Sequence, residues 1–102
     1  MKKKCTVIIY EIGTMELEYS ELDGFIDESG ENISLSYDDE EANLYEYTGV
    51  KHGDGHWILK HKNNEWKEQI VLHKIANHLV YYGYYSCENG MKGFYRILID
   101  KN

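Results

Sequence analysis

Proline is absent from this chain of 102 residues, cysteine occurs twice, and no apolar run is longer than that of Val7–Tyr10. A transmembrane helix needs roughly 20 apolar residues, so the sequence predicts none. Hydrophobic residues make up 42% of the chain and charged residues 28%, proportions that are typical of folded globular proteins rather than disordered ones. The length fits one domain, which we expect to span residues 1–102.

The two cysteines, Cys5 and Cys87, form no C-x-x-C pair of the kind used for redox chemistry or zinc binding. Both lie in apolar or aromatic runs, so we expect buried, reduced thiols. Lys2–Lys4 resemble the basic start of a signal peptide, but the apolar run that follows is short and ends at Glu11. This pattern favours a cytoplasmic protein.

Aromatic residues are plentiful, with ten tyrosines, two tryptophans and two phenylalanines, and they favour strands. Between turn signals about ten residues apart, the side chains alternate in character, as in Ile33, Leu35 and Tyr37, which is the period of half-buried strands. These turn signals are Gly13, Asp23-Gly24, Ser29-Gly30, Gly53-Asp54-Gly55, Asn63-Asn64 and Asn89-Gly90.

The sequence therefore predicts an all-β fold, a compact antiparallel meander or up-and-down barrel of seven to nine short strands. Its clearest hairpin joins residues 80–87 to residues 94–99 through Asn89-Gly90, a dipeptide suited to a type I′ turn. The expected core consists of Val7, Ile9, Met15, Leu17, Ile33, Leu35, Trp57, Leu59, Ile70, Leu72, Leu79, Phe94, Ile97 and Ile99.

An alternative remains for residues 65–79. Val71, Leu72, Ile75, Ala76 and Leu79 have helical spacing, which would give an α+β domain with one helix on a curved antiparallel sheet. The β-branched pair Ile70-Val71 and the turn-forming pair Asn77-His78 favour strands instead.

Charge is distributed unevenly along the chain. Residues 5–46 contain 13 carboxylates and no lysine or arginine, whereas residues 47–102 contain 5 acidic and 8 basic residues and all five histidines. The whole chain carries a net charge of −7, which disfavours direct binding to nucleic acid. It favours docking on a positively charged protein surface, including one that normally holds nucleic acid.

Most motifs for chemistry are absent. His52-Gly53-Asp54-Gly55-His56 has an H-x-D-x-H pattern, but its two glycines predict a turn, which would separate these side chains. Asp38–Glu41 lacks the spacing of a calcium loop. Cys87 with His78 is the one pairing of a nucleophile with a base worth naming, and no glycine elbow accompanies it. We therefore expect no catalytic residue, metal or cofactor, and no membrane partner.

In the C-terminal half, glycines and aromatic residues recur together in four segments. They do so in Tyr47-Thr48-Gly49, Gly55–Leu59, Tyr82–Tyr85 and Gly93–Ile97, and an Asn-Gly hairpin closes the series. This half resembles small prokaryotic lipocalin-like (calycin-type) β-barrels. The resemblance implies a closed antiparallel barrel that can hold a small ligand.

Two functions follow as hypotheses. The first is a non-enzymatic protein whose acidic face docks on a basic partner protein, such as one that handles nucleic acid, in the manner of an inhibitor or immunity protein. Its binding residues would be Asp38, Asp39, Glu40, Glu41, Tyr45 and Tyr47. The alternative is a lipocalin-like barrel that binds a small ligand, with Trp57, Tyr82, Tyr84 and Tyr95 lining its cavity.

Overall fold

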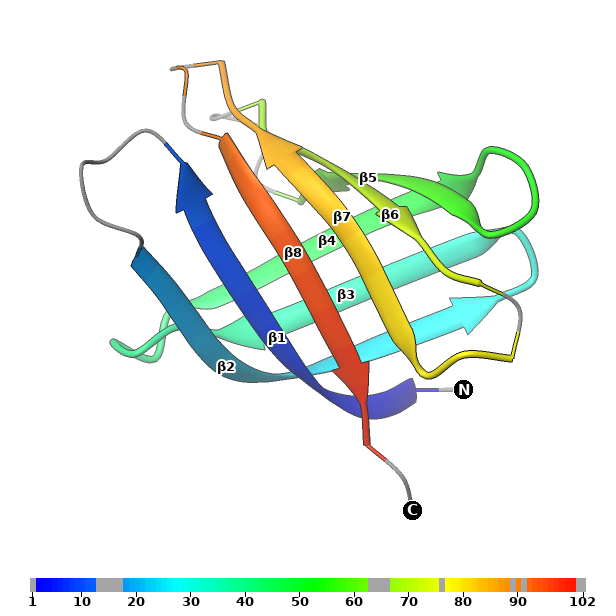
Figure 1. The fold of residues 1–102 in the computed structure, drawn as a ribbon, viewed down its shortest axis with the longest axis horizontal. Helices are drawn as coiled ribbons and strands as arrows, with labels where there is room; N and C mark the ends of the chain where they lie inside the picture. The colour runs from blue at the N-terminus through cyan, green and yellow to red at the C-terminus, as the bar shows by residue number, and fades with distance from the viewer. Residues whose placement is uncertain are drawn as a thin grey trace.

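The structure, a computed structural model, describes residues 2–12, 18–62, 67–75, 77–88, 90 and 92–100. These residues form eight antiparallel strands in a closed barrel, in which each strand pairs with the next and β8 pairs with β1 (Figure 1). The strands are β1 (Lys2–Ile12), β2 (Glu18–Ser29), β3 (Asn32–Asp38), β4 (Leu44–Lys51), β5 (His56–His61), β6 (Gln69–His73), β7 (Val80–Ser86) and β8 (Lys92–Ile99).

The predicted all-β antiparallel barrel is therefore confirmed. In the segment where a helix was the alternative, residues 69–73 form β6, which pairs with β5 and β7. In this five-residue strand, Ile70 and Leu72 face the interior and are buried, and the residues beside them are not. The segment therefore follows the two-residue period of a strand rather than the helical spacing. Residues 65, 66 and 76 lie outside the described part of the chain. No described residue belongs to a helix long and apolar enough to cross a membrane.

The alternation of side chains along each strand determines which of them face the barrel interior. In β3, Ile33, Leu35 and Tyr37 are buried and the residues between them are not. Of the expected core, Ile9 packs against the buried cluster from a partly buried position, and Met15 and Leu17 lie outside the described residues. The others that are buried as expected are Val7, Ile33, Leu35, Trp57, Leu59, Ile70, Leu72, Ile97 and Ile99.

Two expected core residues are instead exposed. Phe94 is 53% exposed because in β8 the odd-numbered residues, such as Tyr95 and Ile97, face inward. Leu79 is 40% exposed and precedes the first residue of β7. Hydrophobicity alone does not make a strand residue buried, because its position in the pleat decides which side of the sheet it faces.

The prediction of a turn at Asp23-Gly24 is also wrong, because both residues lie in the middle of the twelve-residue β2. Gly24 faces the interior, and a Cβ built there would lie 2.4 Å from the backbone oxygen of Ser36 on β3. Here the glycine permits a close approach of two backbones instead of a reversal of the chain. Ser29-Gly30 and Gly53–Gly55 do form turns, between β2 and β3 and between β4 and β5. Gly13, Asn63, Asn64 and Asn89 lie outside the described residues.

Candidate ligand-binding site

One end of the barrel, where β3 leads into β4 and β7 leads toward β8, contains a cavity of about 450 Å³. Its wall is made mainly of tyrosine rings from β3, β4, β7 and β8, together with one buried carboxyl group. We call it the tyrosine pocket. Its lining residues are Ile9, Ser20, Leu22, Tyr37, Asp39, Tyr45, Tyr47, Glu68, Tyr85, Cys87 and Tyr95.

Three of the tyrosines in this wall form a hydrogen-bonded cluster. The hydroxyl of Tyr37 lies 2.6 Å from that of Tyr95 and 3.3 Å from that of Tyr47. The ring of Tyr37 also stacks on those of Tyr45 and Tyr47, with centroid distances of 5.4 and 6.0 Å. These contacts link β3, β4 and β8, so the barrel itself fixes the orientation of the rings.

The phenols of the cluster stay neutral over the ordinary pH range. Burial raises the pKa of Tyr37, Tyr47 and Tyr95 above the usual value of 10.0, and it raises the pKa of Tyr85 to about 12. An ionised phenolate would lose its hydration in this wall, which is the physical cause of the shift. The pocket therefore presents aromatic faces and neutral hydroxyl groups.

Glu68 supplies the buried carboxyl group. Only 8% of the residue is exposed, and among the described residues it is the one charged residue classed as buried. Burial raises the pKa of Glu68 above 4.5, while a hydrogen bond with Tyr47 and the charge of His61 act in the opposite direction. Because burying a carboxylate is costly, its position facing an aromatic cavity marks a candidate binding group.

Asp39 lies at the mouth of the pocket and organises the loop between β3 and β4. Its carboxylate accepts hydrogen bonds from the backbone N–H groups of Glu41 and Asn43, both at 2.9 Å, and from the hydroxyl of Tyr45 at 3.2 Å. The bond from the Asn43 backbone is the largest of the causes that lower the pKa of Asp39. Asp39 thus remains ionised and places a negative charge at the entrance.

The six residues predicted to bind a partner do not form one exposed face. Asp38, Glu40 and Glu41 are exposed around the loop, but Asp39 is engaged in it and Tyr45 is partly buried. Tyr47, which is 1% exposed, faces the barrel interior, so its placement at a docking surface is wrong. It alternates with exposed Thr48, and the sequence pattern alone did not show which of the two faced inward.

The predicted cavity residues are divided between the two sides of the sheet. Tyr95 lines the pocket and Trp57 is buried in the interior. Tyr82 and Tyr84 are about half exposed, at 50% and 49%, and lie on the outer face, so their placement in a cavity is wrong. Pocket residues that the sequence reasoning missed include Tyr37, Tyr85 and Glu68. The inward position of Tyr85 could have been predicted from the sequence, because Tyr85 lies two residues after Gly83 and therefore on the same side of β7.

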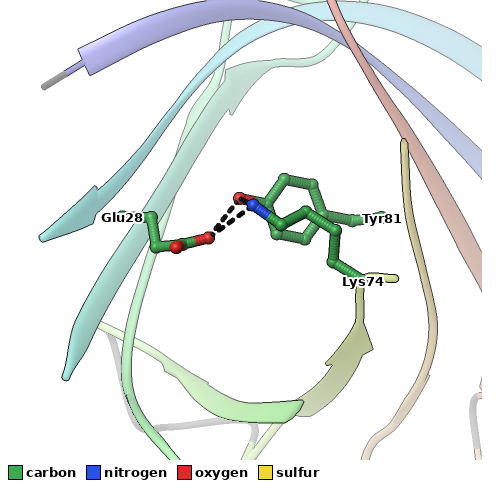
Figure 2. A network of polar contacts seen from close by, with 3 residues as sticks. All are labelled: Glu28, Lys74 and Tyr81. Carbon is green, nitrogen blue, oxygen red and sulfur yellow. Dashed lines mark hydrogen bonds and ion pairs between the residues drawn. The ribbon is translucent and has the colours of Figure 1, made fainter. Parts of the chain in front are cut away.

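The opposite end of the barrel is crossed by a polar network (Figure 2). Glu28 of β2 accepts hydrogen bonds from Lys74 at 3.0 Å and from the hydroxyl of Tyr81 at 2.7 Å. Lys74 also lies 5.0 Å from the ring centre of Tyr81 and 5.9 Å from that of Trp57. The network joins β2, β7 and the chain after β6 across this end, so we assign it a structural role.

The other candidate chemistry is not assembled. Cys5 and Cys87 are free thiols, and burial raises the pKa of Cys5 to about 12 and also raises that of Cys87. His78 precedes β7 and Cys87 follows it, so the two residues lie at opposite ends of that strand. In the described ranges, no group of three or more histidine, cysteine or acidic residues is arranged to hold a metal ion.

The H-x-D-x-H segment forms the hairpin tip between β4 and β5, as predicted. Gly53 and Gly55 have φ angles of 103° and 77°, which the turn requires. His56 instead pairs across the sheet with His73, and the Nδ1 atoms of the two rings lie 2.6 Å apart.

No family model matches the chain and no curated protein is significantly similar to it. The resemblance to lipocalin-like barrels therefore stays a prediction.

Proposed function

We propose that this protein binds a small organic cation, such as an alkylammonium compound, in the tyrosine pocket. The observation that carries the proposal is the composition of the wall: the lining residues that the structure describes include five tyrosines and two carboxyl-bearing residues, and none of them is lysine or arginine. The proposed function requires no chemical step, and it gives a specific form to the small-ligand alternative derived from the sequence.

Aromatic faces attract cations because the π-electrons make the face of a ring negative. Several rings around one cavity are the arrangement that binds quaternary ammonium groups in proteins. The ionised carboxylate of Asp39 at the mouth adds a negative potential, and the carboxyl group of Glu68 inside adds to it when it is ionised. An anionic ligand such as a fatty acid would be repelled by the same groups. The volume of about 450 Å³ suits a small molecule.

A matched ligand pair tests this function directly. We expect choline to bind about tenfold or more tightly than its uncharged carbon isostere, in which a tert-butyl group replaces the trimethylammonium group, because only the charge differs. Titration calorimetry measures both affinities, and tyrosine ring signals in NMR spectra locate the site. A Tyr45→Leu variant should weaken choline binding, whereas Tyr84→Leu, on the outer face, should leave it unchanged.

Two results would contradict this proposal in different ways. Equal binding of both compounds in the pocket would retain a ligand-binding protein but overturn the cationic class. Absence of binding by the cation, the uncharged isostere and an anionic analogue in a folded protein would overturn small-molecule binding altogether.

The acidic surface favours a second candidate function, docking on a basic protein partner as an inhibitor or immunity protein does. Its exposed carboxylates lie on adjacent strands and the loop between them: Glu21 and Asp23 on β2, Asp38 at the end of β3, then Glu40 and Glu41. Opposite charge would accelerate such an encounter. The free thiols fit the reducing cytoplasm expected from the sequence.

Reversing three of these charges tests the second function. The triple variant Asp38→Lys, Glu40→Lys, Glu41→Lys should lose at least tenfold affinity for any basic protein that binds the wild-type chain, and wild-type binding should weaken with added salt. Asp39 is kept because it holds the loop together. The control variant Lys51→Glu, Lys60→Glu carries its changes on β4 and β5 and should bind normally. Equal binding by the triple variant would exclude this surface.

A further inference from the structure

A row of apolar side chains crosses the outer surface of the barrel. The strand register places Tyr84 of β7 beside Phe94 of β8, Phe94 beside Tyr10 of β1, and Tyr10 beside Tyr19 of β2. On its other side Tyr84 lies beside Val71 of β6. We call Tyr84, Phe94, Tyr10 and Tyr19 the aromatic row.

Three of the four side chains of the aromatic row are exposed to solvent, and the fourth, Tyr10, is partly buried. Tyr84 and Phe94 are about half exposed, and Tyr19 is 60% exposed. The rings of Tyr10 and Tyr19 stack with their centres 5.7 Å apart. Adjacent apolar residues on the outside of a small protein indicate a surface that binds another protein, and large aromatic rings are frequent anchors of such contacts.

Two opposite charges flank the centre of this surface. In the next row, Arg96 of β8 and Glu21 of β2 lie on either side of Ile8 of β1. Arg96 is the single arginine in the sequence. Within the described part of the chain, neither Arg96 nor Glu21 has an ion-pair partner. Each charge is therefore available to an outside partner.

We propose that the outer face of β8, β1 and β2 binds a second copy of this chain in a two-fold symmetric dimer. A two-fold axis lying in the interface along β1 exchanges β8 with β2. It brings Arg96 of each copy opposite Glu21 of the other, and Phe94 opposite Tyr19. Tyr10 then lies beside its own counterpart on the axis, whereas Ile8, which is 9% exposed, contributes little to the contact.

Charge selects this occupant over others. A uniformly basic partner would meet Arg96 unfavourably, and a uniformly acidic one would meet Glu21 unfavourably. The outer face carries Lys92 and Arg96 on β8, Lys4 on β1, and Glu21 and Asp23 on β2. Because the two-fold axis exchanges β8 with β2, it places the basic side of each copy opposite the acidic side of the other. The dimer uses the outside of the barrel and leaves the tyrosine pocket unchanged, so it goes beyond the proposed ligand binding and is tested separately.

The test uses charge exchange between copies. The wild-type chain should dimerise with rising concentration in sedimentation velocity measurements. Arg96→Glu and Glu21→Arg should each weaken self-association at least tenfold, because each places like charges together twice. An equal mixture of the two variants should recover a dimer, since every pair is then of opposite charge. Circular dichroism checks that both variants, which change exposed residues, are folded.

Three results would overturn the dimer. The first is a wild-type chain that stays monomeric at the highest concentrations reached. The second is undiminished self-association of either charge variant. The third is a mixture that dimerises no better than its components. The variant Phe94→Ser supplies an independent measurement, because removing a ring from the aromatic row should also weaken the dimer.

Discussion

Replacing Gly83 with alanine should destabilise the barrel by about 3 kcal/mol or more, because the added methyl group has no space. Gly83 lies on β7 between the inward-facing residues Tyr81 and Tyr85. A Cβ built there would lie 1.9 Å from the backbone oxygen of Val71 and 2.9 Å from a methyl carbon of Leu72. That oxygen belongs to β6, so making space for the methyl group requires the two strands to separate.

Gly30→Asn is the matched control for this substitution. Gly30 lies in the turn between β2 and β3 with φ of 62°, and no atom approaches within 4 Å of a Cβ built there. Asparagine tolerates this left-handed conformation, so we expect a cost of about 1 kcal/mol or less. Urea unfolding measures both variants. Similar losses for the two would show that close strand approach is not what requires glycine at position 83.

The fold was predictable because its signal is local and repeated. Alternation in Ile33, Leu35 and Tyr37 specifies one buried face without knowledge of the rest of the chain. It was harder to predict which side of each strand faces the barrel interior. Phe94 and Ile97 lie on opposite sides of β8, since their positions differ by an odd number, and hydrophobicity alone placed both in the core. The parity of Gly83 with Tyr81 and Tyr85 gives the correct assignment for β7.

The pocket was less predictable because it depends on how the barrel closes. Tyr37 and Tyr95 are 58 positions apart, and their 2.6 Å contact exists only when β1 pairs with both β2 and β8. The pattern of residues within one strand does not show how that strand pairs with others around the closed barrel. Glu68 precedes β6, where alternation does not apply, and its sequence neighbours gave no sign that its side chain would be buried.

A buried carboxyl group that costs stability is expected to persist where it binds a ligand. Replacing Glu68 with glutamine, which has the same shape and no charge, should therefore have two opposite effects. The folded state should gain about 0.5–2 kcal/mol at neutral pH, because a desolvated carboxylate is removed. Choline affinity should fall about tenfold or more, because the negative charge inside the pocket is lost.

The pH dependence fixes the sign of the first effect. Burial raises the pKa of Glu68 in the folded state, so its contribution is fully favourable below the ordinary value of 4.5 and is lost as pH rises through the folded-state value. The gain from Glu68→Gln should thus be absent in acid and present at neutral pH. Urea unfolding at both pH values measures it, with Glu31→Gln, an exposed position, as the control.

The binding effect has its own signature. A cation near Glu68 favours the ionised carboxylate, so choline binding should lower the pKa of Glu68 and release protons. The heat of binding should then vary with the ionisation enthalpy of the buffer for the wild-type chain and not for Glu68→Gln. A variant that gains stability and keeps its choline affinity would show that Glu68 is not a binding group. A variant that loses both would show that the carboxyl group instead supports the tyrosine cluster.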